Sequence, residues 1–289
     1  MNKNFFSEKI CWITGASSGI GAALSNTLSS LGAWLILSGR DYQRLELVKR
    51  DCANPEKIIL LPCDMEEGSI LPVVAAQAWN AFQGIDFVFL NAGMAVRDLI
   101  ADTDMAMFEK VMQVNFLSNV QLTKELLPRM EHRGRGCFVV TSSLCGKFGV
   151  PKLGAYSSSK HALHGFYESL RAEQGKNGIK ITMIIAGLVR TNITLHALKG
   201  NGNQYGRMQD SIAAGISPES CAIKILQAVS EGKCEALIGG REILTVWAKR
   251  FFPGLFRMAI TRHPMRKLRQ LGFLKTAPAV THQTSTTSR

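Results

Sequence analysis

Over the first 240 residues, short apolar runs alternate with longer segments in which apolar residues recur at helical spacing. Runs of the first kind are typical of strands buried on both faces, and segments of the second kind of amphipathic helices. This alternation predicts an α/β fold with a doubly wound, mostly parallel sheet of about seven strands and helices on both faces. The predicted strands are Lys9–Thr14, Ala33–Ser38, Lys57–Leu61, Ile85–Leu90, Cys137–Thr141, Ile179–Ile185 and Glu235–Ile238. The predicted helices are Gly19–Leu31, Tyr42–Cys52, Ser69–Phe82, Asp104–His132, Tyr156–Gln174 and Pro218–Glu231.

Three segments depart from the alternation. Thr194–Gly215 is rich in Gly and Asn and has little periodicity, which is typical of a mobile loop beside a substrate site. Residues 243–275 follow the last predicted strand as a basic amphipathic extension, and residues 276–289, rich in Ser and Thr, are expected to be disordered. We therefore expect residues 1–242 to hold the cofactor and substrate sites together in one domain.

Composition agrees with one large domain. The chain has 289 residues, of which 46% are hydrophobic, so its core needs neither a structural metal nor disulfides. The seven cysteines are scattered and form no Cys-x-x-Cys pair, which predicts buried thiols in a reducing compartment. We find no signal peptide and no apolar run of the roughly 20 residues that a spanning helix needs. A cytoplasmic protein, or one attached peripherally to a membrane facing the cytoplasm, is expected.

The net charge of +12 is concentrated near the carboxyl end. No acidic residue follows Glu242, whereas nine basic residues do, and subtracting nine from +12 leaves +3 for residues 1–242. An apolar stripe of Leu244, Trp247, Phe251 and Leu255 runs beside these charges, and Pro253 should kink or break the helix. A basic amphipathic segment with aromatic residues suits an anionic membrane surface, but it can equally pack on the body or on a partner subunit. Nucleic-acid binding is disfavoured, because no recognition motif is present.

A glycine-rich turn joins the first predicted strand to the first predicted helix. It reads Thr14-Gly15-Ala16-Ser17-Ser18-Gly19-Ile20-Gly21. Glycine lets the backbone approach a pyrophosphate closely, and a helix amino terminus offers unpaired N–H groups, so the turn is typical of a Rossmann-type cofactor site. The Gly-x-x-x-Gly-x-Gly spacing differs from Gly-x-Gly-x-x-Gly, and an ordinary strand-to-helix turn is the alternative.

Arg40 follows the second strand at the position where an acidic residue would bind the ribose 2′-hydroxyl of NAD. A guanidinium pairs with a 2′-phosphate through two hydrogen bonds, which favours NADP(H) over NAD(H). The alternative is a solvated loop residue, or one that pairs with Asp41.

With these motifs in order, the chain resembles the short-chain dehydrogenase/reductase family over most of residues 9–240. The resemblance rests on the glycine turn and on a Tyr-x-x-x-Lys pair, with further family positions between and after them. The resemblance implies the following cofactor-binding residues: Gly15, Ser17, Ser18, Gly19, Ile20, Gly21, Arg40, Asp64, Asn91, Ala92, Gly93, Tyr156, Lys160, Gly187 and Thr191. It implies the following catalytic residues: Asn115, Ser143, Tyr156 and Lys160.

The resemblance also implies individual roles. Asp64 would contact the adenine ring, Asn91-Ala92-Gly93 would support the sheet and cofactor, and Thr191 would touch the nicotinamide carboxamide. Two departures are Leu90, where many members have a second Asn, and Ala186-Gly187, where the family usually has Pro-Gly. The missing proline removes a backbone restraint beside the nicotinamide. Family members commonly pair through the helices that contain Asn115 and Tyr156, so a homodimer or homotetramer is expected.

Tyr156 and Lys160 share one helical face, because they are four residues apart. A phenol has a pKa of about 10, and lowering it toward 7 takes about 4 kcal/mol of preferential stabilisation of the phenolate. One ammonium and a cationic nicotinamide could supply this. The resemblance implies that Tyr156 is the general acid/base, that Ser143 binds the substrate carbonyl and that Asn115 completes a proton relay to Lys160. Such Tyr/Lys pairs also occur on many exposed helices, which is the alternative if the pair stands alone.

His161 and His164 on the same helix invite a metal hypothesis. They are three residues apart with no third ligand nearby in sequence, so helix packing is favoured and no metal is expected. The sequence thus predicts an NADP(H)-dependent oxidoreductase that interconverts a carbonyl and a secondary alcohol, with an apolar or lipid-like substrate. The alternatives are an NADP(H)-binding sensor without turnover, and a protein that binds a membrane or a partner through its basic extension.

Overall fold

A seven-stranded parallel sheet forms the centre of the computed structural model, which describes residues 4–175 and 177–261. Its strand order is β3-β2-β1-β4-β5-β6-β7, and every neighbouring pair is parallel. This confirms the predicted doubly wound α/β fold. The strands are β1 (Ile10–Thr14), β2 (Trp34–Ser38), β3 (Ile58–Leu60), β4 (Phe87–Leu90), β5 (Gly136–Ser143), β6 (Ile179–Ala186) and β7 (Glu235–Ile238).

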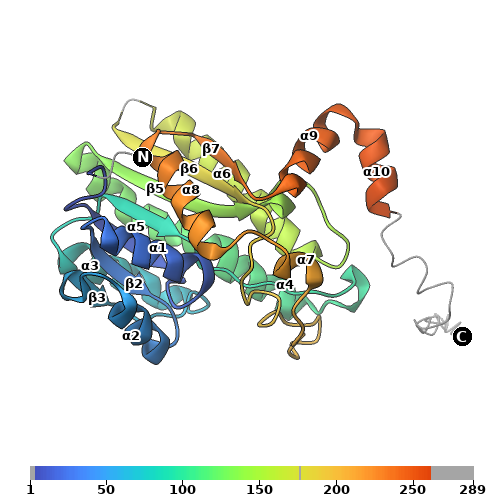
Figure 1. Cartoon of the computed structure of the whole chain (residues 1–289), viewed down its shortest axis with the longest axis horizontal. Coiled ribbons are helices and arrows are strands. Elements are labelled where there is room, and N and C mark those ends of the chain that lie inside the picture. Colours follow the sequence, from blue (N-terminus) through green and yellow to red (C-terminus); the bar gives the residue numbers. More distant parts are fainter. Residues whose placement is uncertain (1–3, 176, 262–289) are drawn as a thin grey trace, which may run out of the picture. The chain divides into compact units, whose positions relative to one another are not determined.

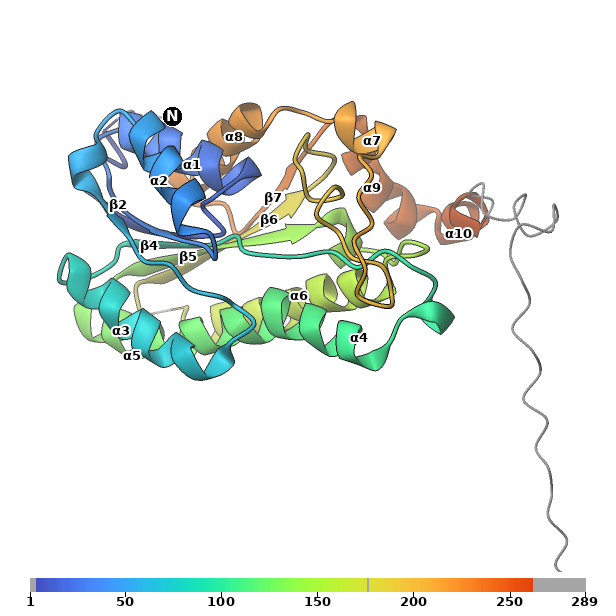
Figure 2. The same cartoon turned by 90° about the horizontal axis from the view of Figure 1, so that it is seen from below.

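Helices cover both faces of the sheet, as Figures 1 and 2 show. One layer holds α1 (Gly19–Ser30), α2 (Tyr42–Asp51) and α8 (Pro218–Ser230), and the other holds α3 (Leu71–Ala81), α5 (Ser118–Arg133) and α6 (Gly154–Glu173). Strands sandwiched in this way must be apolar on both sides. All four residues of β4 are accordingly buried.

The helix predicted over Asp104–His132 is divided into three parts. It consists of α4 (Met105–Met112), a π-helical turn over Gln113–Leu117, and α5. A π-helical turn widens the backbone by one residue and occurs mostly at functional sites. Here it contains Asn115, which is fully buried.

The segment predicted as a loop near the substrate site contains one short helix, α7 (Asp210–Ala213). Leu198 forms isolated bridges with Val96 and Gln204. The Gly200 backbone N–H donates to the Asp98 carboxylate at 3.2 Å. These contacts attach the segment to the chain that leaves β4.

The described residues divide into two units between Val246 and Trp247. After β7 the chain forms α9 (Leu244–Phe251) and α10 (Pro253–Thr261), so the helix ends just before Pro253 and a new one begins there. The rest of the predicted extension, residues 262–275, and the tail predicted as disordered, residues 276–289, lie outside the described residues.

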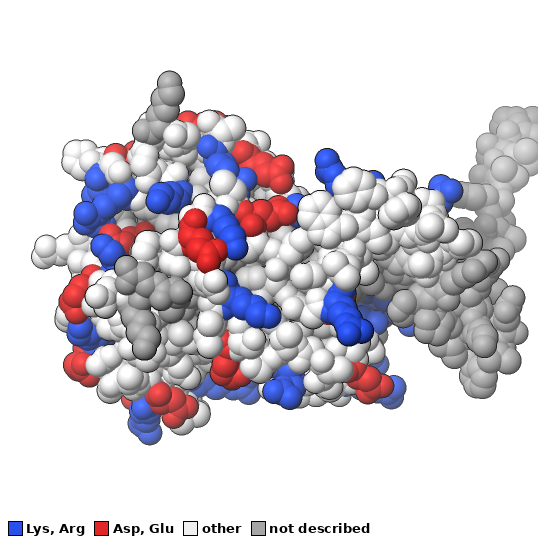
Figure 3. All heavy atoms as spheres, turned by 45° about the horizontal axis from the view of Figure 1, so that its top comes forward, with Lys and Arg blue, Asp and Glu red and all other residues white. Residues whose placement is uncertain are grey.

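Six of the seven cysteines are buried free thiols, as predicted, and Cys234 is exposed. On the face of the first unit seen in Figure 3, basic and acidic side chains are interspersed rather than gathered by sign. Among the described residues, no helix is both long and apolar enough to cross a membrane.

Candidate active site

The glycine turn lies where the strand order reverses, between β1 and β4, which is where ligands bind in doubly wound sheets. Gly15 and Gly19 have φ values of +65° and +55°, in the left-handed region that favours glycine. A Cβ on Gly21 would lie 2.1 Å from the Gly15 carbonyl oxygen. The first i→i−4 hydrogen bond of α1 runs from the Ala22 N–H to the Ser18 carbonyl, at 3.3 Å. The backbone N–H groups before Ala22 therefore have no acceptor within the helix. The turn fits a phosphate group.

Asn91, directly after β4, hydrogen-bonds the backbone of this turn. Its side-chain amide donates to the carbonyl oxygens of Thr14 and Gly15 at 3.2 and 3.3 Å. The Thr14 hydroxyl oxygen in turn accepts from the backbone N–H groups of Asn91 and Ala92 at 3.0 and 3.1 Å. Added to the close approach of Gly15 to Ala92, these bonds fix the turn against the end of β4.

Arg40 is exposed at the end of β2. It does not use Asp41 as a partner among the described residues: the Asp41 carboxylate accepts from the Arg44 backbone N–H at 3.0 Å and pairs with the Arg44 guanidinium at 3.3 Å. Asp41 therefore caps α2. Asp64 lies after β3, and its carboxylate accepts from the Glu66 backbone N–H at 3.0 Å.

Residues 187–191, after β6, lie beside the glycine turn. A Cβ on Gly19 would come within 3.0 Å of the Thr191 methyl group, so Thr191 lies over the start of α1. The Glu242 carboxylate accepts from the Leu188 and Gly240 backbone N–H groups, both at 2.8 Å. Burial opposes its ionisation, but these bonds outweigh burial and lower the pKa of Glu242. Glu242 thus restrains the segment in which the family's usual proline is missing. No sequence signal pointed to it, because the contact to Leu188 spans 54 residues.

Ser143, Tyr156 and Lys160 converge from β5 and α6. Ser143 ends β5, and its hydroxyl oxygen accepts from the Cys145 backbone N–H at 3.2 Å. The Lys160 Nζ lies 5.8 Å from the centroid of the Tyr156 ring and donates to the Thr141 carbonyl at 2.7 Å. Lys160 is only 3% exposed. Burial lowers the pKa of its ammonium to about 8.

The phenol pKa moves in the direction opposite to the sequence expectation. Burial raises the pKa of Tyr156 well above its ordinary value, Cys145 adds to the rise, and a hydrogen bond with the Ser143 side chain only partly lowers it. The Lys160 ammonium lies over the Tyr156 ring and donates its hydrogen bond to the Thr141 carbonyl, not to the phenol oxygen. Within the chain alone, desolvation therefore outweighs the hydrogen bond with Ser143.

Asn115 joins three segments around this site. Its side-chain oxygen accepts from the Met94 N–H at 2.8 Å, and its amide donates to the Met94 carbonyl at 2.9 Å and to the Ser159 hydroxyl at 3.0 Å. The Ser159 hydroxyl donates to the Tyr156 carbonyl at 2.8 Å. The side chain of Asn115 thus positions the chain after β4 and the turn of α6 that carries Tyr156. Sequence reasoning missed Ser159, although it directly precedes Lys160.

A second polar group lies behind Lys160 and contains His164, for which the sequence favoured helix packing. The Ser142 hydroxyl lies 3.0 Å from His164 Nε2 and donates to the Lys160 carbonyl at 3.4 Å. A Cβ on Gly146 would lie within 2.8 Å of that carbonyl, so Gly146 permits this close packing. Burial, together with the nearby Lys147 ammonium, lowers the pKa of His164 to about 4, so its imidazole is neutral at pH 7. His161, in contrast, contacts its own helix through the Ser157 carbonyl at 2.8 Å.

A doubly wound parallel sheet with a glycine-rich turn at its switch point is typical of dinucleotide-binding α/β proteins. Comparison with known proteins identifies the family. The profile of the family described as "short chain dehydrogenase" matches residues 9–201. The chain belongs to the short-chain dehydrogenase/reductase family, and it is an oxidoreductase of the kind that binds NAD(P)(H).

Relatives and solved structures agree with this assignment. "Dehydrogenase/reductase SDR family protein 7-like" of Drosophila melanogaster is 35% identical over 262 residues, covering 88% of this chain and 80% of that protein. "Dehydrogenase/reductase SDR family member 7B" of Danio rerio is 35% identical over 264 residues, covering 88% and 85%. The crystal structure of a short-chain dehydrogenase from Streptomyces avermitilis superposes with a TM-score of 0.73 at 23% identity, covering 92% of this chain and 98% of that one, and shows the shared fold.

Proposed function

We propose that the protein is an NADP(H)-dependent oxidoreductase that interconverts a carbonyl and a secondary alcohol, with Tyr156 as the general acid/base. The observation that carries the proposal is the convergence of Ser143, Tyr156 and the buried Lys160 at the carboxyl end of β5. A binding protein without turnover has no use for a desolvated ammonium beside a phenol ring. The sensor alternative is therefore not favoured.

Each residue has a separate task in the reaction. When bound, the nicotinamide supplies or accepts the hydride. Ser143 orients the substrate oxygen by a hydrogen bond, and the Tyr156 hydroxyl donates a proton to that oxygen in reduction or accepts one in oxidation. The Lys160 ammonium, held by the Thr141 carbonyl, stabilises negative charge on the phenol oxygen. Asn115 positions both the chain after β4 and the Tyr156 turn.

An apolar substrate is part of the proposal. Three apolar residues are candidates for lining the substrate site. The side chain of Phe148 is 7% exposed and that of Leu195 is 38% exposed. Leu198 packs against the buried cluster of Val96, Val111 and Ala155. The test is NADPH oxidation with straight-chain methyl ketones of increasing length. We expect kcat/KM to rise with chain length, because each buried methylene contributes about 0.8 kcal/mol. Equal or falling kcat/KM along the series would reject the apolar substrate, and no turnover with any carbonyl would reject the proposed reaction.

The cofactor preference rests on Arg40. Replacing Arg40 with aspartate is expected to weaken NADPH binding by about 10- to 100-fold, because a charge-assisted hydrogen bond contributes about 1.5–3 kcal/mol, and to leave NADH binding within a few-fold. Fluorescence titration with each nucleotide measures this. Arg50→Gln is the matched control, since Arg50 pairs with Glu46 at the far end of α2. NADH binding tighter than NADPH binding in the unchanged protein would overturn the NADP(H) preference.

Attachment to an anionic membrane is a separate proposal for the extension. Within the second unit, the Trp247 and Phe251 rings stack with centroids 6.0 Å apart. Replacing both with alanine is expected to reduce flotation with phosphatidylserine vesicles by at least tenfold, because aromatic residues anchor amphipathic helices at the interface. Val73→Ala, at an exposed apolar residue on α3, is the control. Equal flotation of the double variant and the unchanged chain would contradict the proposal.

A further inference from the structure

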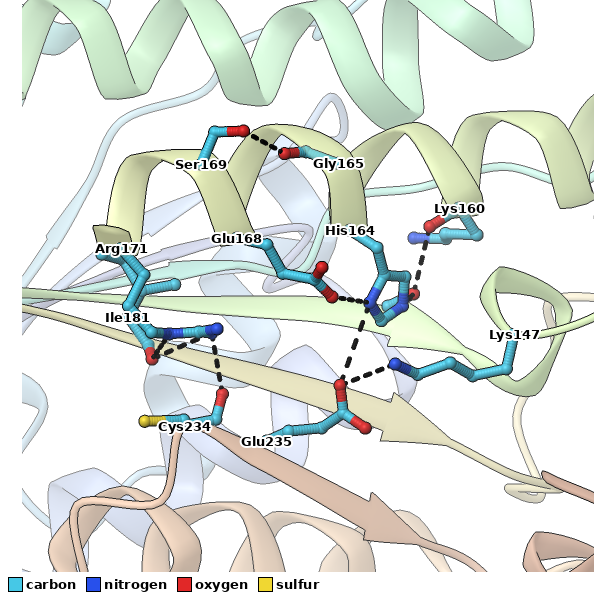
Figure 4. A network of polar contacts seen from close by, with 11 residues as sticks. Lys147, Lys160, His164, Gly165, Glu168, Ser169, Arg171, Ile181, Cys234 and Glu235 are labelled. Carbon is cyan, nitrogen blue, oxygen red and sulfur yellow. Dashed lines mark hydrogen bonds and ion pairs between the residues drawn. The ribbon is translucent and has the colours of Figure 1, made fainter. Parts of the chain in front are cut away.

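Behind the catalytic turn of α6, three side chains that can ligate a metal meet. His164 and Glu168 lie one turn apart on α6, and Glu235 begins β7, beside them in Figure 4. One ligand atom from each lies within 4.8 Å of the others. His164 Nδ1 is 3.6 Å from Glu168 Oε1 and 4.0 Å from Glu235 Oε2. The three residues come from two elements that only the fold brings together, so the sequence hypothesis about His161 and His164 lacked the other ligands.

The Nδ1 atom of His164 is buried and makes no hydrogen bond within the described part of the chain. His164 is only 8% exposed, and Nδ1 has no hydrogen-bond partner among the described residues. The distance of 3.6 Å to Glu168 is longer than a hydrogen bond. Burying an unpartnered polar atom costs about 1–3 kcal/mol, so such an atom aimed at two carboxylates indicates a ligand.

The hydrogen bonds on the other side of the ring favour one His164 tautomer. The Ser142 hydroxyl has one proton, which it donates to the Lys160 carbonyl, so its oxygen accepts from His164 Nε2–H. Nδ1 of the neutral imidazole then carries a lone pair. A lone pair facing two carboxylates is electrostatically unfavourable, and a cation between the three groups would relieve this, as the Lys147 ammonium does in part through Glu235.

We propose that His164, Glu168 and Glu235 form a binding site for a divalent transition-metal ion of the Zn²⁺ class. One imidazole nitrogen and two carboxylate oxygens suit Zn²⁺, whereas Mg²⁺ and Ca²⁺ take oxygen ligands. Tetrahedral Zn²⁺ with bonds of about 2.0–2.2 Å places its ligands about 3.3 Å apart. The carboxylates need to approach Nδ1 by less than 1 Å, and both are partly exposed and able to rotate.

Lys147 competes for this site. Its Nζ lies 2.7 Å from Glu235 Oε2, the oxygen that faces His164. The ion must therefore displace the ammonium from this oxygen or share the carboxylate with it. Replacing Lys147 with methionine should accordingly strengthen metal binding. The bound ion would join α6 to β7 directly behind the Lys160 carbonyl, through His164 and Ser142.

The experiment is a titration of the full chain, freed of metal by a chelator, with Zn²⁺ alone against a chromophoric competitor. We expect Glu168→Gln and Glu235→Gln each to weaken Zn²⁺ binding at least tenfold, and Lys147→Met to strengthen it. Glu173→Gln on the same helix, His161→Gln and Cys234→Ser should bind within twofold of the unchanged chain. Cys234 is needed as a control because this exposed thiol precedes Glu235. We replace the exposed carboxylates and not His164, because His164 hydrogen-bonds the buried Ser142 hydroxyl. Replacing His164 would risk unfolding the chain.

Thermal unfolding gives an independent measurement, since an ion that binds only the folded state raises Tm. Zn²⁺ should raise Tm in the unchanged chain and not in the two glutamine variants, and Mg²⁺ at the same concentration should have no effect. Three outcomes would overturn the proposal: unchanged Zn²⁺ affinity in both glutamine variants, loss of binding in Cys234→Ser, or a Tm rise with Mg²⁺ but not with Zn²⁺.

Discussion

Replacing Tyr156 with phenylalanine is expected to lower kcat by about 10²- to 10⁴-fold, the range over which general acid/base groups contribute. The variant keeps the ring that lies beside the Lys160 ammonium and loses only the phenol hydroxyl. Binding of NADPH should therefore change by no more than a few-fold. The measurement is steady-state turnover of the best methyl ketone, together with a fluorescence titration of the cofactor.

Tyr167→Phe is the matched control for this substitution. Tyr167 lies on the same helix, is fully buried, and its hydroxyl lies 2.8 Å from that of Thr123. Loss of that hydrogen bond should reduce the free energy of unfolding by about 1 kcal/mol and leave turnover within a few-fold. Turnover that survives in Tyr156→Phe would reject Tyr156 as the acid/base. An equal loss in both variants would show that the effect comes from packing of α6.

The sheet could be predicted because its strands are apolar on both faces. An unbroken apolar run such as Phe87–Leu90 is typical of a strand that is buried between two layers of helices. The π-helical turn at Gln113–Leu117 could not be predicted in this way. Its local sequence continues a helical pattern, and its stabilising contacts, from Asn115 to Met94 and Ser159, are tertiary.

The order of the reacting residues along the chain could also be predicted, but their electrostatics could not. Spacing places Tyr156 and Lys160 on one face of a helix whatever surrounds them. The direction of the Tyr156 pKa depends on how deeply the phenol is buried and on where the ammonium points. Similarly, the ligands that surround His164 are visible only once β7 lies beside α6. Residues that act through contacts distant in sequence, such as Glu242, leave no local pattern.

Lys160→Met is expected to lower turnover strongly without unfolding the protein. Loss of the ammonium removes the charge that stabilises the phenolate, so kcat should fall by at least about 100-fold. The buried ammonium itself destabilises the fold, since its pKa falls from 10.5 to about 8. At pH 7 this shift corresponds to about 3 kcal/mol. Against this, the variant leaves the Thr141 carbonyl without its bond from Nζ, at about 1–3 kcal/mol. The free energy of unfolding at pH 7 should therefore stay the same or rise.

The pH dependence of stability separates these two effects. A lysine whose folded-state pKa is depressed binds fewer protons in the folded state than in the unfolded state between about pH 8 and 10.5, so stability rises with pH over that range. Relative to Lys160→Met, the unchanged protein should gain about 2 kcal/mol between pH 7 and pH 9.5 in urea unfolding. Lys180→Met, at an exposed position on β6, should show no such gain. If the difference in stability between the unchanged protein and Lys160→Met stayed constant with pH, the Lys160 ammonium would be solvated. Water would then screen its charge, and it could not stabilise the Tyr156 phenolate as we propose.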